Sequence, residues 1–243
     1  MNSGYLHSVS SIISHPLLEE YPALWASTQP PLRRLIMARD HHIFMHGDTA
    51  SSLWLMISGW VKLIRQTPDG KESVVGLCTD GDMFGEAALF AHANYPYTAQ
   101  VIGNDTELVA MPSATIRDMI AKDPSLSARI MALLNERTGQ AQLKLEQQST
   151  MSAAQRLGCF LIRLCQTQAS GERLLRIPVE KHILASYLGM KPETLSRSQH
   201  QLKSLNVNVD GHEVMVNDIE KLRQFVCNSC SQSGSCDAEE ALG

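Results

Sequence analysis

The pattern of apolar and polar positions changes character several times along the chain. From Ile36 to about Val109, short apolar or β-rich runs alternate with turn sequences, at Gly47-Asp48, Pro68-Asp69-Gly70 and Asp80-Gly81-Asp82. Many short strands between closely spaced turns are typical of a β-sandwich, roll or barrel. The pattern therefore predicts a β-domain, preceded by a helical or irregular segment that Pro16, Pro22, Pro30 and Pro31 interrupt.

A helical period follows, from about Pro112 to Gln148, with Pro124 near the start of a long helix. Its broad apolar stripe consists of Leu126, Ile130, Met131, Leu133, Leu134, Ala141 and Leu145. A stripe of this width needs a partner, which is either the chain's own core or the same helix of a second copy. We interpret it as the seam of a homodimer.

Beyond an amphipathic helix from Met151 to Cys165, the segment from Arg176 to Val216 combines helix, turn and hairpin signals. Ile183, Leu184, Tyr187 and Leu188 recur at helical spacing, Gly189 supplies a turn, and Pro192 suits the first position of a second helix. Four valines, Val207, Val209, Val214 and Val216, bracket the turn Asp210-Gly211, a strong hairpin signal. Two helices and a short hairpin predict a winged helix-turn-helix.

The second of these helices carries polar residues suited to base contacts. Glu193, Ser196 and Arg197 stand at i, i+3 and i+4 and so share one face near its N-terminus. That end of a recognition helix reaches the major groove, where Arg pairs with guanine and Glu accepts from cytosine. We add Lys191, Thr194 and His200 to the predicted DNA-binding residues. A helical hairpin with surface charges is the alternative, which the following β-hairpin disfavours.

Composition and charge narrow the class of protein. The chain has 243 residues, 44% of them hydrophobic and 19% charged, with a net charge of −4. Its length allows two domains, and no run of about 18 apolar residues predicts a membrane span. No secretory signal is evident, so we expect a cytoplasmic protein. The negative net charge still permits DNA binding, because a mild basic bias is confined to residues 181–203.

Several stretches together resemble the CRP/FNR family of bacterial transcription regulators: LWLMISGWVKLIR (53–65), TPDG (67–70), GDMFGEAAL (81–89), YPYTAQV (95–101) and PETLSRSQHQL (192–202). The resemblance covers roughly residues 15 to 225. It implies an α+β fold with an N-terminal double-stranded β-helix (a cupin-like β-roll), a long dimerisation helix and a C-terminal winged helix-turn-helix. We expect these parts at residues 1–111, 112–150 and 151–226, with a cysteine-containing tail at 227–243.

The motif Glu193-Thr-Leu-Ser196-Arg197 resembles the E-x-x-S-R motif of the FNR branch. This resemblance implies a homodimer on double-stranded DNA, with palindromic half-sites of the TTGAT type. It places Arg197 on guanine, Glu193 on cytosine or adenine amino groups, and Ser196 on the thymine side. We expect a transcription activator that contacts RNA polymerase, although activation and repression are not distinguished by the sequence.

The signal is less evident from the sequence. Cyclic-nucleotide members of the family use a Gly-Glu pair and an Arg that neutralises the phosphate. Gly85-Glu86 is present, but Tyr97 stands where that Arg would be. A phenol supplies no positive charge to an anionic ligand. The sequence therefore argues against a cyclic nucleotide as the effector.

Six cysteines divide into two groups. Cys78, Cys159 and Cys165 lie in apolar patterns and are interpreted as packing residues. Cys227, Cys230 and Cys236 lie in a polar tail, where a C-x2-C step suits two thiolates on one metal or cluster. Some relatives hold a cluster on such a trio with a carboxylate, for which Glu146 is our candidate. A [4Fe–4S] cluster, a zinc ion and a thiol switch or spectator tail remain open.

A further branch of the family senses nitric oxide through haem, so haem is the alternative cofactor. The candidate axial ligands are His7, His15, His41, His42, His46 and His92, and no spacing distinguishes one of them. No P-loop, G-x-S-x-G or H-E-x-x-H motif occurs, so we do not expect an enzyme. The competing functions are a redox or metal-binding protein using the cysteine trio and a cyclic-nucleotide-responsive regulator.

Overall fold

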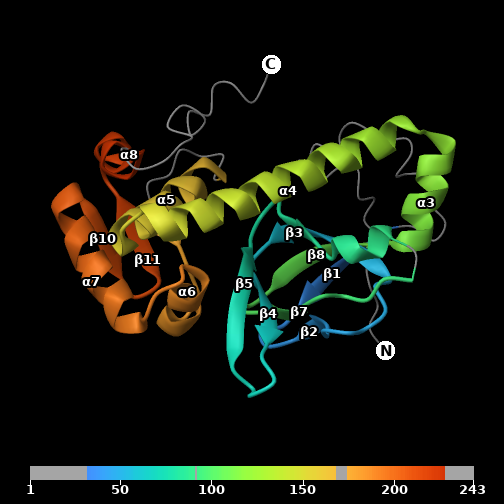
Figure 1. Ribbon diagram of the computed structural model, residues 1–243, viewed down its shortest axis with the longest axis horizontal. Coiled ribbons are helices and arrows are strands. Elements are labelled where there is room, and N and C mark those ends of the chain that lie inside the picture. The colour runs from blue at the N-terminus through green and yellow to red at the C-terminus, as the bar shows by residue number, and fades with distance from the viewer. Residues whose placement is uncertain (1–31, 91, 168–173, 228–243) are drawn as a thin grey trace. The chain divides into compact units, whose positions relative to one another are not determined.

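The computed structural model describes residues 32–90, 92–167 and 174–227. The chain divides into two compact units, residues 1–137 and 138–243 (Figure 1). The long helix α4 (Ser125–Thr150) contains the division, so its N-terminal half belongs to the first unit and its C-terminal half to the second. None of the helices in the described ranges is long and apolar enough to cross a membrane.

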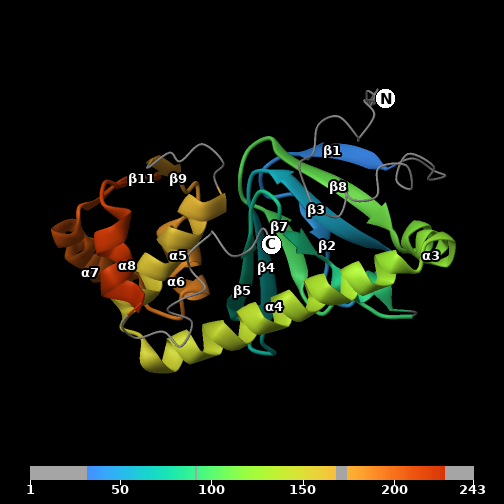
Figure 2. The same cartoon turned by 90° about the horizontal axis from the view of Figure 1, so that it is seen from above.

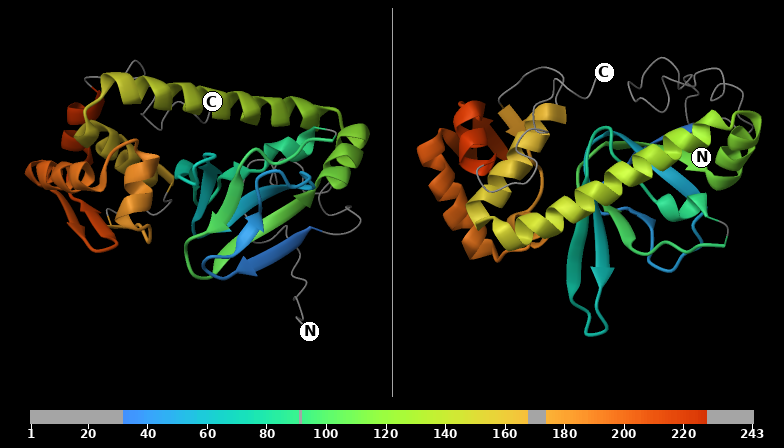
Figure 3. Two further views of the ribbon diagram at one scale, coloured as in Figure 1. Left: turned by 60° about the horizontal axis from the view of Figure 1, so that its bottom comes forward. Right: turned by 45° about the horizontal axis from the view of Figure 1, so that its top comes forward.

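The first unit is a β-roll of two four-stranded antiparallel sheets. One sheet has the order β1-β8-β3-β6, and Figure 2 shows β1, β8 and β3 side by side; the other has the order β2-β7-β4-β5. The strands are β1 (Arg33–Met37), β2 (His42–Phe44), β3 (Ser52–Ser58), β4 (Val61–Gln66), β5 (Glu72–Cys78), β6 (Met83–Phe84), β7 (Thr98–Val101) and β8 (Thr106–Pro112). The predicted β-roll is confirmed, and β4 and β5 form a hairpin at the predicted turn Pro68-Asp69-Gly70 (Figure 3).

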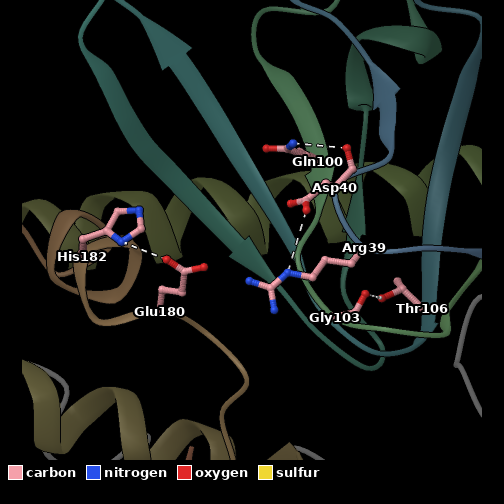
Figure 4. A network of polar contacts seen from close by, with 7 residues as sticks. All are labelled: Arg39, Asp40, Gln100, Gly103, Thr106, Glu180 and His182. Atoms are coloured by element: carbon pink, nitrogen blue, oxygen red, sulfur yellow. Dashed lines mark hydrogen bonds and ion pairs between the residues drawn. The ribbon is translucent and has the colours of Figure 1, made fainter.

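Aromatic side chains fill the space between the two sheets. Phe44 stacks on Tyr95 with ring centroids 3.6 Å apart, and it also lies 6.0 Å from Phe84 and 5.7 Å from Tyr97. The Tyr95 hydroxyl donates to the Ser52 carbonyl at 2.6 Å, so the buried phenol is satisfied. At the surface of the roll, Gln100 Nε2 donates to the Asp40 carbonyl at 3.2 Å (Figure 4). The roll therefore has a continuous aromatic core that joins both sheets.

Helix α3 (Ser113–Lys122) and the first half of α4 pack on the roll. Leu126 and Ile130 of α4 are 0% and 7% exposed and belong to the core cluster that contains Leu53 and Met111. Our interpretation of the whole α4 stripe as a dimer seam is therefore wrong for these two residues. Met131 and Leu145 of the same stripe are 65% and 68% exposed.

In its described residues, the second unit combines the C-terminal half of α4 and four further helices with a three-stranded sheet. Its elements after α4 are α5 (Ala153–Thr167), β9 (Leu174–Arg176), α6 (Lys181–Tyr187), α7 (Pro192–Leu202), the 3₁₀ turn η3 (Lys203–Leu205), β10 (Val207–Asp210), β11 (Glu213–Val216) and α8 (Ile219–Cys227). The sheet order is β10-β11-β9. The predicted winged helix-turn-helix is confirmed, but strand β9 and helix α8 were not predicted.

Helix α8 packs closely on α5 at Gly158. A Cβ added there would lie 2.7 Å from Val226 Cγ2 and 3.1 Å from Leu222 Cδ1, so a glycine permits this approach. Leu222 and Val226 are 0% and 2% exposed. Cys227, which we assigned to the tail, is the last residue of α8.

Candidate nucleic-acid interface and sensory site

The turn between α6 and α7 is built from local signals. Leu188 caps α6 at its C-terminal end, and Gly189 adopts a left-handed φ of +64°, which a glycine reaches without strain. The Met190 N–H donates to the Ala185 carbonyl at 3.0 Å and closes the turn. Helix α7 then begins at Pro192, whose missing N–H would have no partner inside the helix.

One face of α7 is buried and the opposite face is exposed. Leu195, Ser198 and Leu202 are buried, and the Ser198 hydroxyl donates to the Thr194 carbonyl at 2.9 Å. The predicted DNA-binding residues Lys191, Glu193, Ser196, Arg197 and His200 are exposed, whereas Thr194 is half-buried at the flank. The Ser196 hydroxyl donates to the Pro192 carbonyl at 3.2 Å, so it must turn away from the helix to contact a base. The structure thus presents five of the six predicted residues to solvent.

The wing sheet has one buried and one exposed side. Val207, Val214 and Val216 are buried, while Asp210 and Glu213 at the turn are exposed. Strand β9 adds Arg176 opposite Glu213, and the two side chains form an ion pair of 3.3 Å.

Four exposed cations lie on or beside α6 and α7. Exposed Lys181 and Lys191 precede Arg197 and Lys203, whereas the wing turn carries acids. On α6, His182 Nδ1 lies 3.3 Å from the Glu180 carboxylate (Figure 4). A surface with this distribution offers phosphate contacts beside α7.

A polar cluster in the roll links the short 3₁₀ helix η2 (Glu86–Leu89) to α4 and consists of Glu86, Tyr97 and Arg137. The Tyr97 hydroxyl donates to Glu86 Oε2 at 2.8 Å and accepts from the Gly85 N–H at 2.9 Å. Arg137 of α4 forms an ion pair with the other oxygen of Glu86. Burial raises the pKa of Tyr97 above its ordinary value, so the hydroxyl keeps its proton for Glu86.

Each of the two units matches the description of a known protein family. The family description "Cyclic nucleotide-binding domain" matches residues 35–123, and "Crp-like helix-turn-helix domain" matches residues 155–225. The nitrogen fixation regulation protein FixK of Rhizobium meliloti is 30% identical over 188 residues, which cover 76% of this chain and 83% of FixK. The chain belongs to the CRP/FNR family of transcription regulators.

Two further similarities agree with this assignment. The cyclic AMP receptor protein of Thermus thermophilus is 31% identical over 170 residues, covering 70% of this chain and 76% of that protein. The structure of FixK2 from Bradyrhizobium japonicum superposes with a TM-score of 0.71 at 18% identity, over 79% of this chain and 96% of FixK2, which shows the shared fold. The resemblance to the family inferred from the sequence is confirmed, and DNA-binding transcription regulation follows from it.

Tyr97 is at the centre of the polar cluster in the roll. Tyr97 takes the amide of Gly85 and the carboxylate of Glu86, the groups that begin η2. The Tyr97 hydroxyl therefore ties the start of η2 to the chain just before strand β7 through two hydrogen bonds. Sequence reasoning found Tyr97 but missed Arg137, because Arg137 lies 51 residues from Glu86 and no local motif connects them.

The predicted metal-binding residues are only partly described. Cys227 and Glu146 are half-buried, and Cys230 and Cys236 lie outside the described residues. Of the haem candidates, His41, His42, His46 and His92 are exposed, while His7 and His15 fall outside. In the described part of the chain, no three His, Cys, Asp or Glu side chains come together as a metal site.

The remaining cysteines differ in burial. Cys78 is 2% exposed and packs in the roll core, as predicted. Cys159 and Cys165 are half-buried on α5, where Gln147 Nε2 donates to the Cys159 sulfur at 3.1 Å. Burial raises the pKa of the Cys165 thiol, so that cysteine is a poor nucleophile.

Proposed function

We propose that this CRP/FNR regulator acts as a homodimer on a two-fold DNA site with half-sites of the TTGAT type. The observation that carries this proposal is the exposed face of α7. Arg197 contacts guanine, Glu193 the amino groups of cytosine or adenine, and Ser196 the thymine side, with Lys191, Thr194 and His200 beside them. By the same proposal the protein is cytoplasmic, contacts RNA polymerase and has no catalytic activity.

The exposed part of α4 supports the dimer. Met131 and Leu145 are 14 positions apart, which is two heptads, and both are more than half exposed. A parallel pair of α4 helices would cover these side chains and place two α7 helices on one side of the DNA.

We propose a redox or gas signal, oxygen or nitric oxide, in place of a cyclic nucleotide. The contacts of Glu86 argue against a cyclic nucleotide. Its carboxylate is already bonded to Tyr97 and Arg137, and Tyr97 itself brings no positive charge for a phosphate. Cys227, Cys230 and Cys236, with Glu146 as a fourth ligand, are the proposed ligands of a [4Fe–4S] cluster. Haem, zinc and a thiol switch are the alternatives that the experiment below separates.

The DNA proposal is tested with Arg197→Ala. Binding of the full chain to a two-fold TTGAT duplex should weaken by about 1–3 kcal/mol, and preference at one base pair should relax. Arg65→Ala, an exposed arginine on β4, is the matched control and should bind as the parent does. Fluorescence anisotropy at fixed salt measures both. If Arg197→Ala bound both the specific and the random DNA with the affinities of the parent, the assignment of α7 would be refuted.

The signal is tested by purification without oxygen, with a visible spectrum and assays for iron, sulfide, zinc and haem. We expect iron and sulfide in the parent and neither in Cys230→Ser. Zinc or haem in their place selects the corresponding alternative. A colourless, metal-free protein whose DNA binding is the same in Cys230→Ser contradicts the cluster.

A further inference from the structure

The guanidinium of Arg156, in the first turn of α5, bonds to the ends of two other helices. Its Nη1 donates to the Met151 carbonyl at 2.8 Å, one residue beyond the end of α4. Its Nε donates to the Leu188 carbonyl at 3.1 Å, at the C-terminal cap of α6. Carbonyls at the C-terminal end of a helix lack partners inside the helix and carry partial negative charge, so they accept well from a cation. Arg156 therefore joins α4 to the helix-turn-helix through one side chain.

Two side chains of α4 contact the same end of α6. Lys144 Nζ lies 3.8 Å from the centroid of the ring of Tyr187, the last residue of α6, and this packing removes much of the amine from water. A Cβ added at Gly189, in the turn before α7, would lie 3.0 Å from Gln148 Nε2, so the Gln148 amide lies against this turn. The start of α7 is thus placed by contacts with the end of α4.

The planar shape of the guanidinium suits a bridge between two carbonyls. Its N–H groups point in fixed directions in one plane, and here Nη1 and Nε serve different helices. Met151 and Leu188 are 5% and 7% exposed, so water competes little for their carbonyls. A lysine carries the same charge on one flexible ammonium, which does not hold two carbonyls in a fixed geometry. The shape of the side chain at position 156 therefore matters as well as its charge.

This bridge bears on how two half-sites are bound. Leu145, on the proposed dimer seam, belongs to the same end of α4 as the bridge. In a dimer, the seam and the bridge together set the separation of the two α7 helices. Binding of a second half-site gains from a fixed separation only if that separation matches the spacing of the half-sites. A loosely held helix-turn-helix loses part of this gain and tolerates other spacings.

We propose that Arg156 is a positioning residue that sets the half-site spacing this regulator recognises, because it holds α6 and the turn before α7 to the end of α4. This inference rests on the dimer and the two-fold site proposed above. Arg156 is half-buried and bonded to backbone carbonyls, so the proposal gives it no contact with DNA. Its effect appears when two half-sites are bound and is absent when one is bound.

The test measures the affinity of the full chain for a series of two-fold duplexes by fluorescence anisotropy at fixed salt. The spacing of the half-sites is shortened or lengthened by one and by two base pairs, and in one further duplex a half-site is scrambled. Each base pair moves one half-site by about 3.4 Å and turns it by roughly 35° about the DNA axis. The parent should therefore bind one spacing about tenfold or more tightly than the others.

Arg156→Gln should bind the scrambled duplex as the parent does and the optimal two-fold duplex about tenfold more weakly, so its preference among spacings should flatten. Arg156→Lys keeps the charge without the bridge and should flatten the profile in the same way. The matched control is Arg223→Gln, which removes an arginine that pairs with Glu220 within α8. This control should keep the spacing profile of the parent.

A sharp, parent-like spacing profile in Arg156→Gln, or its full recovery in Arg156→Lys, would overturn the proposal. Weaker binding of Arg156→Gln to the scrambled duplex, with a smaller dependence of affinity on salt, would also overturn it, because that combination identifies a lost phosphate contact. If Arg156→Gln unfolds the domain and loses all binding, the profile of Arg156→Lys decides in the same way. A parent that binds the two-fold and scrambled duplexes equally well at every spacing would instead refute the dimer on a two-fold site, which separates the two failures.

Discussion

The Tyr97 hydroxyl is the most informative single atom to remove from the roll. In Tyr97→Phe the aromatic ring, with its contact to Phe44, stays in place, while the Gly85 N–H and one Glu86 oxygen lose their partner. The substitution therefore isolates the polar contacts of the hydroxyl from its packing. If these contacts hold η2 in place, their loss should lower the stability of the first unit.

The expected size follows from the two contacts. A buried amide left without a partner costs about 1–3 kcal/mol, and a hydrogen bond to a carboxylate contributes about 1.5–3 kcal/mol. Glu86 is 24% exposed and keeps Arg137, so water recovers part of the second value. We expect a loss of about 2–4 kcal/mol in the free energy of unfolding.

Urea unfolding followed by tryptophan fluorescence is a suitable assay, because all three tryptophans of the chain lie in residues 1–137. A double-mutant cycle with Glu86→Gln separates the contact with Glu86 from the contact with Gly85. A loss below about 0.5 kcal/mol, or no coupling between the two positions, would show that the Tyr97–Glu86 contact does not organise η2.

Three further outcomes follow from the packing of the second unit and of α4. Gly158→Ala should lower the free energy of thermal unfolding by about 1–3 kcal/mol, since the new methyl overlaps Val226. Gly139→Ala on α4, whose Cβ would meet nothing within 4 Å, should instead raise it by up to about 1 kcal/mol. Equal effects of the two substitutions would contradict the α5–α8 contact. Leu145→Glu should shift the protein from dimer to monomer in sedimentation velocity, and an unchanged dimer would place the seam elsewhere. Because the pKa of Lys144 is lowered in the fold, the parent should gain stability relative to Lys144→Met as pH rises from 8 to 10.5, which urea unfolding at several pH values measures.

Local signals predicted the parts of the fold whose geometry is decided within a few residues. Gly189, Pro192 and Asp210-Gly211 each mark a turn or helix start through their own backbone preferences, and the structure has the expected element at each. Strand β9 was missed because it is only three residues long and pairs with β11 about 40 positions away. Helix α8 was missed as well, and its buried side chains pack on α5 at Gly158. Their formation depends on partners that no short window of sequence contains.

The α4 stripe illustrates the same limit for binding surfaces. Its period correctly indicated an apolar helix face, but period alone does not say which residues the chain itself covers. Leu126 and Ile130 pack in the roll, whereas Met131 and Leu145 stay exposed. Similarly, the sequence indicated Glu193 and Arg197 by their spacing, while Arg137 and Lys144 acquire their contacts only when distant segments meet.

The close approach of α8 to α5 at Gly158 also fixes the position of Cys227, the first cysteine of the C-terminal trio. Val226 packs against this glycine, and Cys227 is the next residue and the end of the helix. The first thiol of the trio is therefore anchored to the DNA-binding unit, independently of the path taken by the residues after it. Oxidation or metal binding at Cys227 would therefore change the position of α8 at its contact with Gly158 of α5.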